Sequence, residues 1–458
     1  MDMEPWYWLN ENSRTFLSRG YLIEGQTPEG RAKEIGETAA KILGKPEFAD
    51  KFVDYMSKGW ISLATPVWTN FGLERGLPIS CFGSYVPDDM ANILHSQAEV
   101  GMMSKYGGGT SGYFGALRGR GADITNNGYS SGPVHFMQLF ETILNVVSQG
   151  ATRRGTFAAY LPVEHPDILE HLDIGTEGNP IQKINHAVTV GNEWMQSMID
   201  GDEDKRKIWA KIIQRRGEIG YPYIMFVDNA NDGRTKAHKD QDLKIYASNV
   251  CSEIMLPSKD DWSFVCCLSS INLRHYDDWK DSDLVETMIQ LLDAVMTEFI
   301  EKLEAMRDSE HSDKRMAFGF LEHAYNFAKA NRALGLGTLG YHSLLQYKNL
   351  PFASKEAEEL NKEVFETIQK KSYEEITNIL KMDVKKVKSF LSTKIQIEVK
   401  DCKGQLIMTS QTAKTKEKDY AKAYNIVVRE AFKSFESLNY KYEPKPKNDE
   451  VVILKKEE

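Results

Sequence analysis

Apolar residues recur at helical spacing through the first part of the chain. The run TPEGRAKEIGETAAKIL (residues 27–43) begins with Thr27 and Pro28, a pair typical of a helix start. Apolar side chains then follow three and four positions apart, which places them on one helical face. We therefore expect residues 1–60 to form a helical N-terminal region.

From residue 61 to residue 373 the pattern changes to short apolar runs separated by glycine-rich turns and helical segments. Strand-like runs include YPYIMFVD (221–228) and WSFVCCLSSINL (262–273). VHFMQLFETILNVVSQ (134–149) and DEDKRKIWAKIIQRRGE (202–218) have the helical period. Strands that alternate with helices over this length predict an α/β architecture, either a barrel or an open sheet.

The last part of the chain has a different pattern. TKIQIEVKDCKGQLIMTSQ (393–411) alternates apolar and polar residues, turns at 401–404 and becomes apolar again, which predicts a hairpin. Apolar residues between 420 and 438 share one helical face. From residue 374 onward 18 Lys and Arg stand against 14 Asp and Glu, in a chain of net charge −9. We expect a separate ββα module at 380–445 and a flexible tail at 446–458.

Composition narrows the class of protein. The chain has 458 residues, of which 27% are charged, and its net charge of −9 disfavours binding to long nucleic acids, which needs a basic face. No apolar run approaches the roughly 20 residues that cross a bilayer, so we expect no membrane partner. The polar N-terminal segment lacks the pattern of a signal peptide, and a cytoplasmic protein is expected.

Five cysteines without a CxxC pair predict neither a disulfide scaffold nor a zinc site, and no metal ligand set is expected. Asn249, Cys251 and Glu253 follow one another at every second position. In an extended segment these side chains point to the same side, so a thiol, an amide and a carboxylate general base would share one pocket. A buried structural cysteine is the alternative.

A second group of thiols is Cys266 and Cys267. Adjacent residues of a strand point to opposite faces, so only one of these two thiols can share a pocket with Cys251. Cys81 lies far away in sequence, and a fold that brings it to this pair would create a redox-active dithiol beside a third thiol. Unrelated buried cysteines are the alternative. The glycine run YGGGTSG (106–112) fits either an anion-binding nest or a tight turn.

Eight segments, taken together in their order, resemble the large catalytic subunit of ribonucleotide reductase over about residues 5–373. They are ATPVWTN, ISCFGSYVPDDM, SKYGGGTSGYFGALRGRG, SQGATRRG, GTEGNP, SNVCSEIMLP, VCCLSSINL and RALGLGTLGYHSLL. The resemblance implies a helical N-terminal region and the family's ten-stranded α/β barrel. It also implies reduction of ribonucleotides to 2′-deoxyribonucleotides by a thiyl radical.

The resemblance assigns roles to the polar residues noted above. Cys251 corresponds to the thiyl-radical cysteine that abstracts the 3′ hydrogen, Glu253 to the base at the 3′ hydroxyl, and Asn249 to an amide that binds the sugar hydroxyls. Cys81 corresponds to the thiol that protonates the departing 2′ hydroxyl. Its redox partner aligns best with Cys266, and Cys267 is the alternative.

Further positions match contacts to nucleotides in the family. Thr65, Ser80 and Gly108 correspond to substrate-binding residues, and Asp88 and Arg120 to effector-binding residues. Residues 175–185 correspond to the loop that links effector binding to substrate choice.

The resemblance also implies partners. They are a ribonucleoside diphosphate substrate, nucleoside triphosphate effectors, a thioredoxin- or glutaredoxin-like reductant, and a second copy of the chain. We expect a radical-generating small subunit that contains a metal, with adenosylcobalamin as the alternative radical source, and no cofactor bound directly.

The resemblance ends near residue 373. The family's phosphate-binding loop, its Tyr-Tyr pair and a C-terminal cysteine pair have no counterpart in this sequence. We therefore expect an incomplete barrel that a second chain completes. The alternatives are a catalytically inactive remnant that at most binds nucleotide, and an interaction protein that acts through its C-terminal module.

Overall fold

The computed structural model describes residues 4–150, 153–384, 396–400, 406–410, 440–443 and 451–456. The chain divides into two compact units. The first unit contains Met1–Thr235, Leu243–Leu273 and Leu291–Leu339. The second contains Lys236–Asp242, Arg274–Gln290 and Gly340–Glu458.

The first unit begins with three helices, as the apolar spacing predicts. They are α1 (Glu11–Ser18), α2 (Pro28–Leu43) and α3 (Phe48–Ser57). Thr27 caps α2 by accepting a hydrogen bond from the N–H of Gly30, and Pro28 occupies the first turn, where no N–H is needed. Gly44 ends the helix in the left-handed conformation that glycine adopts without strain. The predicted helix start at Thr27 and Pro28 is confirmed.

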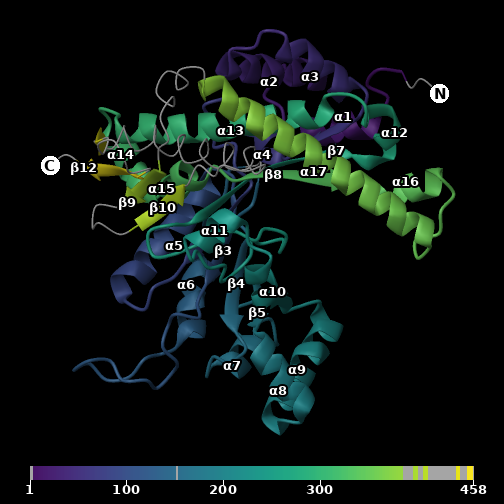
Figure 1. The fold of residues 1–458 in the computed structure, drawn as a ribbon. Coiled ribbons are helices and arrows are strands. Elements are labelled where there is room, and N and C mark those ends of the chain that lie inside the picture. The colour runs from purple at the N-terminus through teal and green to yellow at the C-terminus, as the bar shows by residue number, and fades with distance from the viewer. Residues whose placement is uncertain are drawn as a thin grey trace. The chain divides into compact units, whose positions relative to one another are not determined.

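The sheet of the first unit has eight strands in the order β1-β7-β2-β3-β4-β5-β6, and β8 pairs with β7. Strands β3, β4 and β5 lie side by side in Figure 1. The strands are β1 (Ile61–Leu63), β2 (Cys81–Tyr85), β3 (Gly109–Tyr113), β4 (Phe157–Pro162), β5 (Asn185–Val190), β6 (Tyr223–Phe226), β7 (Phe264–Asn272) and β8 (Leu334–Leu339). Strands β2 to β6 are parallel to one another, whereas β7 is antiparallel to β1 and β2. This alternation of parallel strands with helices confirms the α/β prediction.

Helices connect these strands. They are α4 (Thr65–Asn70), α5 (Met90–Lys105), α6 (Pro133–Val146), α7 (Ile168–Leu172), α8 (Asn192–Asp200), α9 (Glu203–Ile219), α10 (Val227–Asp232), α14 (Ser312–Gly319) and α15 (Glu322–Asn331); α13 (Leu284–Arg307) has residues in both units. In the described part of the chain no helix has the length and apolar content required to cross a bilayer.

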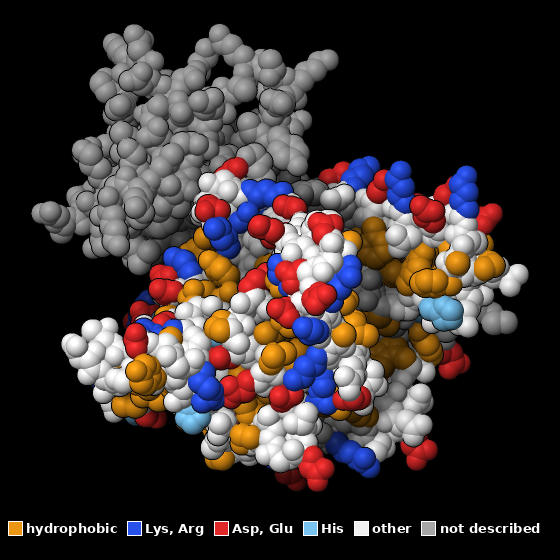
Figure 2. All heavy atoms as spheres, turned by 90° about the horizontal axis from the view of Figure 1, so that it is seen from below, with side chains coloured by type: hydrophobic (Ala, Val, Ile, Leu, Met, Phe, Trp, Pro, Cys, Tyr) orange, Lys and Arg blue, Asp and Glu red, His pale blue; other side chains and the backbone are white. Residues whose placement is uncertain are grey.

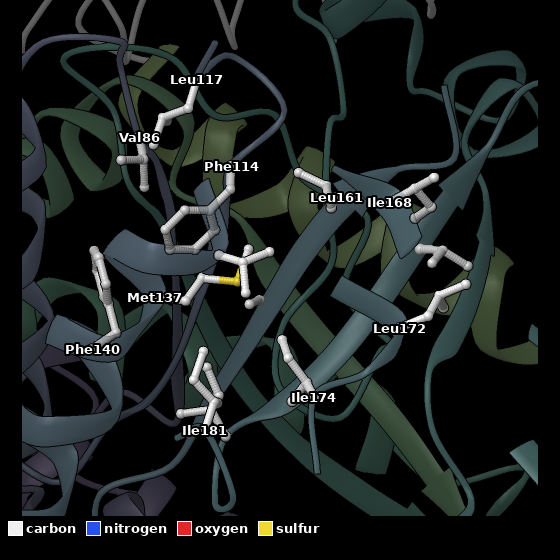
Figure 3. Packing of buried hydrophobic residues seen from close by; sticks show 14 of the residues in the cluster. Val86, Phe114, Leu117, Met137, Phe140, Leu161, Ile168, Leu172, Ile174 and Ile181 are labelled. Atoms are coloured by element: carbon white, nitrogen blue, oxygen red, sulfur yellow. The ribbon is translucent and has the colours of Figure 1, made fainter. Parts of the chain in front are cut away.

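A large apolar core lies between the parallel strands and helices α6 and α7 (Figure 3). Phe114, Phe140 and Phe157 are fully or almost fully buried, and their ring centroids lie 5.0 to 6.0 Å apart. Aromatic pairs at such distances add about 0.5–1.5 kcal/mol to the free energy of burial. This core gives the parallel strands, and the loops that follow them, a rigid support.

Strands β2 and β7 approach each other closely at Gly83. Gly83 lies opposite Phe264, and a Cβ at this position would overlap the Phe264 ring. We expect Gly83→Ala to lower the free energy of unfolding by about 1–3 kcal/mol, because the buried ring has to move. Urea denaturation measures this change. Gly217→Ala is the control: Gly217 lies in α9 with open space where a Cβ would be added, and helix propensity predicts a gain of up to about 1 kcal/mol.

The second unit contains α11 (Lys236–Asp240), α12 (Tyr276–Trp279), α16 (Tyr341–Tyr347) and α17 (Lys355–Val384). The hydroxyl of Tyr276 lies 3.0 Å from a carboxylate oxygen of Glu363, so α12 packs on α17 within this unit. Helix α17 continues past residue 373, where the resemblance was expected to end.

A second sheet of four strands follows α17. Its order is β10-β9-β12-β11, with β9 (Gln396–Lys400), β10 (Leu406–Ser410), β11 (Tyr440–Glu443) and β12 (Val451–Lys456). Strands β9 and β10 are antiparallel, in agreement with the predicted hairpin. The helix predicted between 420 and 438 lies outside the described residues. The region predicted as a flexible tail contains β12, whose β-branched run Val-Val-Ile favours a strand.

The surface mixes charges of both signs. On the face drawn in Figure 2, Lys and Arg side chains lie among Asp and Glu side chains, with apolar side chains between them. Interspersed charges of this kind are typical of a solvated protein surface.

Candidate active site

The segment around Cys251 forms a tight turn and not the extended segment that the residue spacing suggested. The N–H of Ser252 donates to the carbonyl oxygen of Asn249 at 3.1 Å, and Ser252 has a φ of 65°. The extended geometry is therefore wrong. The turn leaves the Cys251 thiol exposed while its neighbour Asn249 is fully buried.

The side-chain amide of Asn249 holds this turn together. Its Oδ1 accepts hydrogen bonds from the N–H groups of Glu253 and Ile254, both at 3.0 Å. Its Nδ2 lies 2.8 Å from Oε2 of Glu253 and 3.4 Å from Sγ of Cys81. One buried amide thus connects the turn that carries Cys251, the carboxylate of Glu253 and the thiol of Cys81.

We expect Asn249→Ala to lower the free energy of unfolding by roughly 2–4 kcal/mol, because two backbone N–H groups lose their acceptor. Urea denaturation followed by circular dichroism measures the change. Asn326→Ala is the control, because the Asn326 amide makes only a 3.5 Å contact with the carbonyl oxygen of Asp261. Equal stabilities for the two variants would contradict the structural role of Asn249.

Cys81 and Cys266 lie directly opposite each other on the antiparallel strands β2 and β7. Both side chains are buried. Directly opposite residues have Cα atoms about 4.5–5.5 Å apart, which is within the range that a disulfide bridges. Cys267 points to the other face of β7, where its thiol lies 3.3 Å from the carbonyl oxygen of Leu292. Of the two adjacent cysteines, Cys266 is therefore the one placed beside Cys81.

The three neighbouring thiols have different acidities. Hydrogen bonding between the two thiols lowers the pKa of Cys81 and raises that of Cys266, and the amide of Asn249 also lowers the pKa of Cys81. Burial, with the charges of Cys81 and Glu253, raises the pKa of Cys251. Cys81 is accordingly the most acidic of the three thiols, and Cys251 keeps its proton at neutral pH.

Two residues that the sequence did not single out also belong to this site. The hydroxyl of Tyr160, on β4, donates to the carbonyl oxygen of Asn249 at 2.9 Å and so supports the turn. The guanidinium of Arg153 lies 3.1 Å from the carbonyl oxygen of Gly107, and its charge lowers the pKa of both Cys81 and Cys251. Arg153 belongs to the segment SQGATRRG, and the two adjacent arginines of this segment were the sequence signal that could have identified it as a site residue.

Two of the predicted substrate-binding residues lie next to the cysteines. Ser80 precedes Cys81, and its buried hydroxyl has no hydrogen-bond partner among the described residues. The carbonyl oxygen of Ser80 accepts from the N–H of Gly109 at 2.8 Å, which brings Gly108 to the start of β2. A Cβ on Gly109 would lie 3.0 Å from Val250, so this glycine run also packs against the turn before Cys251.

Thr65 is connected to the sheet less directly. It begins α4, and its hydroxyl lies 3.0 Å from that of Tyr21. The N–H of the preceding residue, Ala64, donates to Ser269 on β7 at 3.2 Å. Thr65 is thus anchored next to the strand that carries Cys266.

The predicted effector residues Asp88 and Arg120 are not paired with each other. Asp88 forms a 2.7 Å ion pair with Arg118, whereas Arg120 forms a 2.7 Å ion pair with Glu170. The backbone N–H of Arg120 also donates to Asp167 at 2.9 Å. In these two ion pairs Asp88 and Arg120 lie at the surface. Arg118 is a further candidate for contact with an anion.

The loop at residues 175–185 is held by one carboxylate. Glu141, on α6, accepts hydrogen bonds from the backbone N–H groups of Gln182, Lys183 and Ile184 at 2.9 to 3.3 Å. Three N–H groups on a single carboxylate fix the end of the loop where it enters β5.

Comparison with known proteins places this geometry in a family. Residues 7–76 match the model "Ribonucleotide reductase, all-alpha domain", and residues 79–205 and 200–429 match "Ribonucleotide reductase, barrel domain". The barrel match continues beyond residue 373, the predicted end of the resemblance. Part of the predicted ββα module therefore lies inside the matched range.

Individual relatives agree with these matches. A protein of Frog virus 3 (isolate Goorha), "Putative ribonucleoside-diphosphate reductase large subunit", is 34% identical over 345 residues, which are 71% of this chain and 58% of the relative. The "Ribonucleoside-diphosphate reductase large subunit" of Invertebrate iridescent virus 3 is 28% identical over 395 residues, 70% of this chain and 59% of the relative. The chain thus spans somewhat less than two thirds of these two curated relatives.

A solved structure is also similar. The "Actinobacillus ureae class Id ribonucleotide reductase alpha subunit" is 49% identical and superposes with a TM-score of 0.76, covering 83% of this chain and 69% of that chain. The predicted helical N-terminal region and incomplete α/β barrel are confirmed by this similarity and by the family matches. The chain belongs to the ribonucleotide reductase large-subunit family.

Proposed function

We propose that this chain reduces ribonucleoside diphosphates to 2′-deoxyribonucleoside diphosphates by a thiyl-radical mechanism. The observation that carries the proposal is the hydrogen-bonded cluster in which Asn249 joins Glu253 to Cys81, with Cys251 in the same turn and Cys266 opposite Cys81. Removing a hydroxyl group from an unactivated carbon needs a radical at the neighbouring carbon, a base and two reducing equivalents. This cluster contains a residue for each of these tasks.

In the proposed reaction the Cys251 thiyl radical abstracts the 3′ hydrogen, and Glu253 accepts the proton of the 3′ hydroxyl. The 2′ hydroxyl leaves as water with a proton from Cys81, whose lowered pKa makes it the best proton donor of the three thiols. Cys266 then donates a hydrogen atom to the 2′ carbon and bonds to the Cys81 thiolate, and the resulting disulfide anion returns one electron, with the proton held by Glu253, to the 3′ carbonyl. Cys251 finally returns a hydrogen atom to the 3′ carbon. Overall, one ribonucleotide and two thiols give one deoxyribonucleotide, one disulfide and water.

The remaining residues have binding roles in this proposal. The hydroxyl of Ser80, which has no partner among the described residues, would contact the substrate together with Thr65 and the glycine run at Gly108. Asp88 and Arg120, with the loop at 175–185, would respond to a nucleoside triphosphate effector. A second copy of the chain is a further proposed partner.

The radical and the electrons have to come from partners. We propose a metal-containing small subunit as the radical source, with adenosylcobalamin as the alternative, and a thioredoxin- or glutaredoxin-like protein as the reductant of the disulfide. The thiols have to be reduced before each turnover, which suits a reducing compartment such as the cytoplasm.

The test is an assay of ribonucleoside diphosphate reduction with dithiothreitol. The chain is assayed with a radical-generating small subunit, and separately with adenosylcobalamin. Both assays are repeated with a second polypeptide that carries the C-terminal barrel strands of a relative. Deoxyribonucleotide in any of these assays supports the proposal, and the productive combination identifies the radical source. No product in any of them, under conditions in which a related α subunit is active, would contradict it.

A further inference from the structure

A group of metal-ligating side chains lies away from the cysteines in the first unit. His95 and Glu99 are one helical turn apart on α5, and His323 lies in the first turn of α15. One ligand atom from each of the three residues lies within 4.8 Å of the other two. Nδ1 of His323 is 3.9 Å from Oε1 of Glu99, and the two imidazole centroids are 4.8 Å apart.

The carboxylate of Glu99 is buried, and one of its oxygens forms no hydrogen bond within the described part of the chain. The residue is 1% exposed, and its Oε2 accepts a hydrogen bond from the hydroxyl of Ser84 at 3.1 Å. Oε1, the atom nearest to His323, has no hydrogen-bond partner among the described residues. An unpartnered buried carboxylate oxygen is costly, and a bound cation would remove that cost.

We propose that His95, Glu99 and His323 bind one divalent transition metal ion, such as Zn²⁺ or Co²⁺. Two imidazoles and one carboxylate are a ligand set that these ions prefer. Bonds of about 2.0–2.2 Å in a tetrahedral site place ligand atoms roughly 3.4 Å apart, so small side-chain movements suffice to close the observed distances.

The surroundings also suit a metal ion. Nε2 of His95 lies 3.4 Å from the carbonyl oxygen of Gly319, and a metal-bound imidazole usually donates its second N–H to such an acceptor. The carboxylates of Asp260 and Asp261 lie near His323. These two carboxylates add negative potential beside the ligands.

The proposed metal would connect distant parts of the sequence. His323 also accepts, through its carbonyl oxygen, the N–H of Ser263 at 3.3 Å, just before β7 begins. A metal shared by α5 and α15 would therefore fix the start of the strand that carries Cys266. We infer a structural role for the ion, independent of the radical chemistry.

Titration of the metal-free full chain with Co²⁺ tests the proposal. The visible absorption of the bound Co²⁺ reports its coordination, and a thiolate ligand would add strong charge-transfer bands. We expect one Co²⁺ per chain, without thiolate bands, and a rise in the melting temperature. His95→Ala, Glu99→Gln and His323→Ala should each weaken binding by at least about 100-fold, since even outer-shell substitutions cost 10–100-fold. His135→Ala, at an exposed histidine of α6, is the matched control and should bind like the original chain.

Circular dichroism shows whether each variant is folded. If a histidine variant is unfolded, Glu99→Gln, which preserves the shape of the side chain, provides the test in its place. The proposal is overturned if the folded variants bind Co²⁺ as tightly as the original chain, if the bound ion shows thiolate bands, or if the original chain binds none.

Discussion

Cys251→Ala is expected to abolish deoxyribonucleotide formation by the assembled reductase. The alanine has no atom that can carry the radical, so no alternative route to the 3′ hydrogen remains. Loss of the atom that forms the reactive intermediate typically costs a factor on the order of 10⁴–10⁶ in rate. The measurement is product formed per minute with a ribonucleoside diphosphate, the radical source and dithiothreitol. Since Cys251 is exposed in a turn, the substitution should leave the melting temperature almost unchanged.

Cys267→Ser is the matched control for this experiment. It also removes a thiol, but the Cys267 side chain faces Leu292, and a serine hydroxyl can donate to the same carbonyl oxygen. We expect this variant to retain most of the activity. Turnover by Cys251→Ala above the background of an enzyme-free sample would refute the assignment of the radical to Cys251.

Cys266→Ser is expected to prevent sustained turnover, because Cys81 then has no partner with which to form a disulfide. Product should fall below about 1% of that of the original chain, since the proposed reaction takes its two electrons from this pair. Serine preserves the size of the side chain in the β2–β7 contact, so folding should be retained. The activity assay described above, run with dithiothreitol in excess, measures the loss.

Peptide mapping of the chain alone gives an independent measurement of the same pair. Mild oxidation should link Cys81 to Cys266 in the original chain and in Cys267→Ser, and should not do so in Cys266→Ser. A disulfide between Cys81 and Cys267, or normal turnover by Cys266→Ser, would contradict the pairing that the strand register indicates.

Local sequence signals predicted the elements well. The Thr27-Pro28 helix start, the strand from residue 264 and the hairpin after residue 395 all depend on neighbouring residues, and the structure contains each of them. The site residues came from resemblance to a family, because spacing alone left a structural cysteine as an alternative explanation for Cys251.

The contacts between distant residues could not be predicted in the same way. Cys81 and Cys266 are 185 positions apart in the sequence. The register of β2 against β7 is what shows that Cys266, and not Cys267, lies opposite Cys81. The turn at Asn249 was mistaken for an extended segment because its geometry depends on side-chain hydrogen bonds to the backbone.

The partners of charged residues and of the proposed metal ligands could not be predicted from the sequence for the same reason. Asp88 pairs with Arg118 and not with Arg120, although all three residues stand in recognised segments. Glu99 and His323 come from helices that lie more than two hundred positions apart in the sequence.

Hydrogen abstraction by Cys251 is tested most directly by a competition between a ribonucleoside diphosphate carrying deuterium at the 3′ carbon and one carrying hydrogen there. Both are supplied to the assembled reductase, and the isotope content of the early product is measured. We expect the deuterated substrate to be consumed more slowly, and deuterium at the 5′ carbon to have no such effect. Equal consumption of the two 3′ isotopologues by an enzyme that forms deoxyribonucleotide would contradict hydrogen abstraction by Cys251.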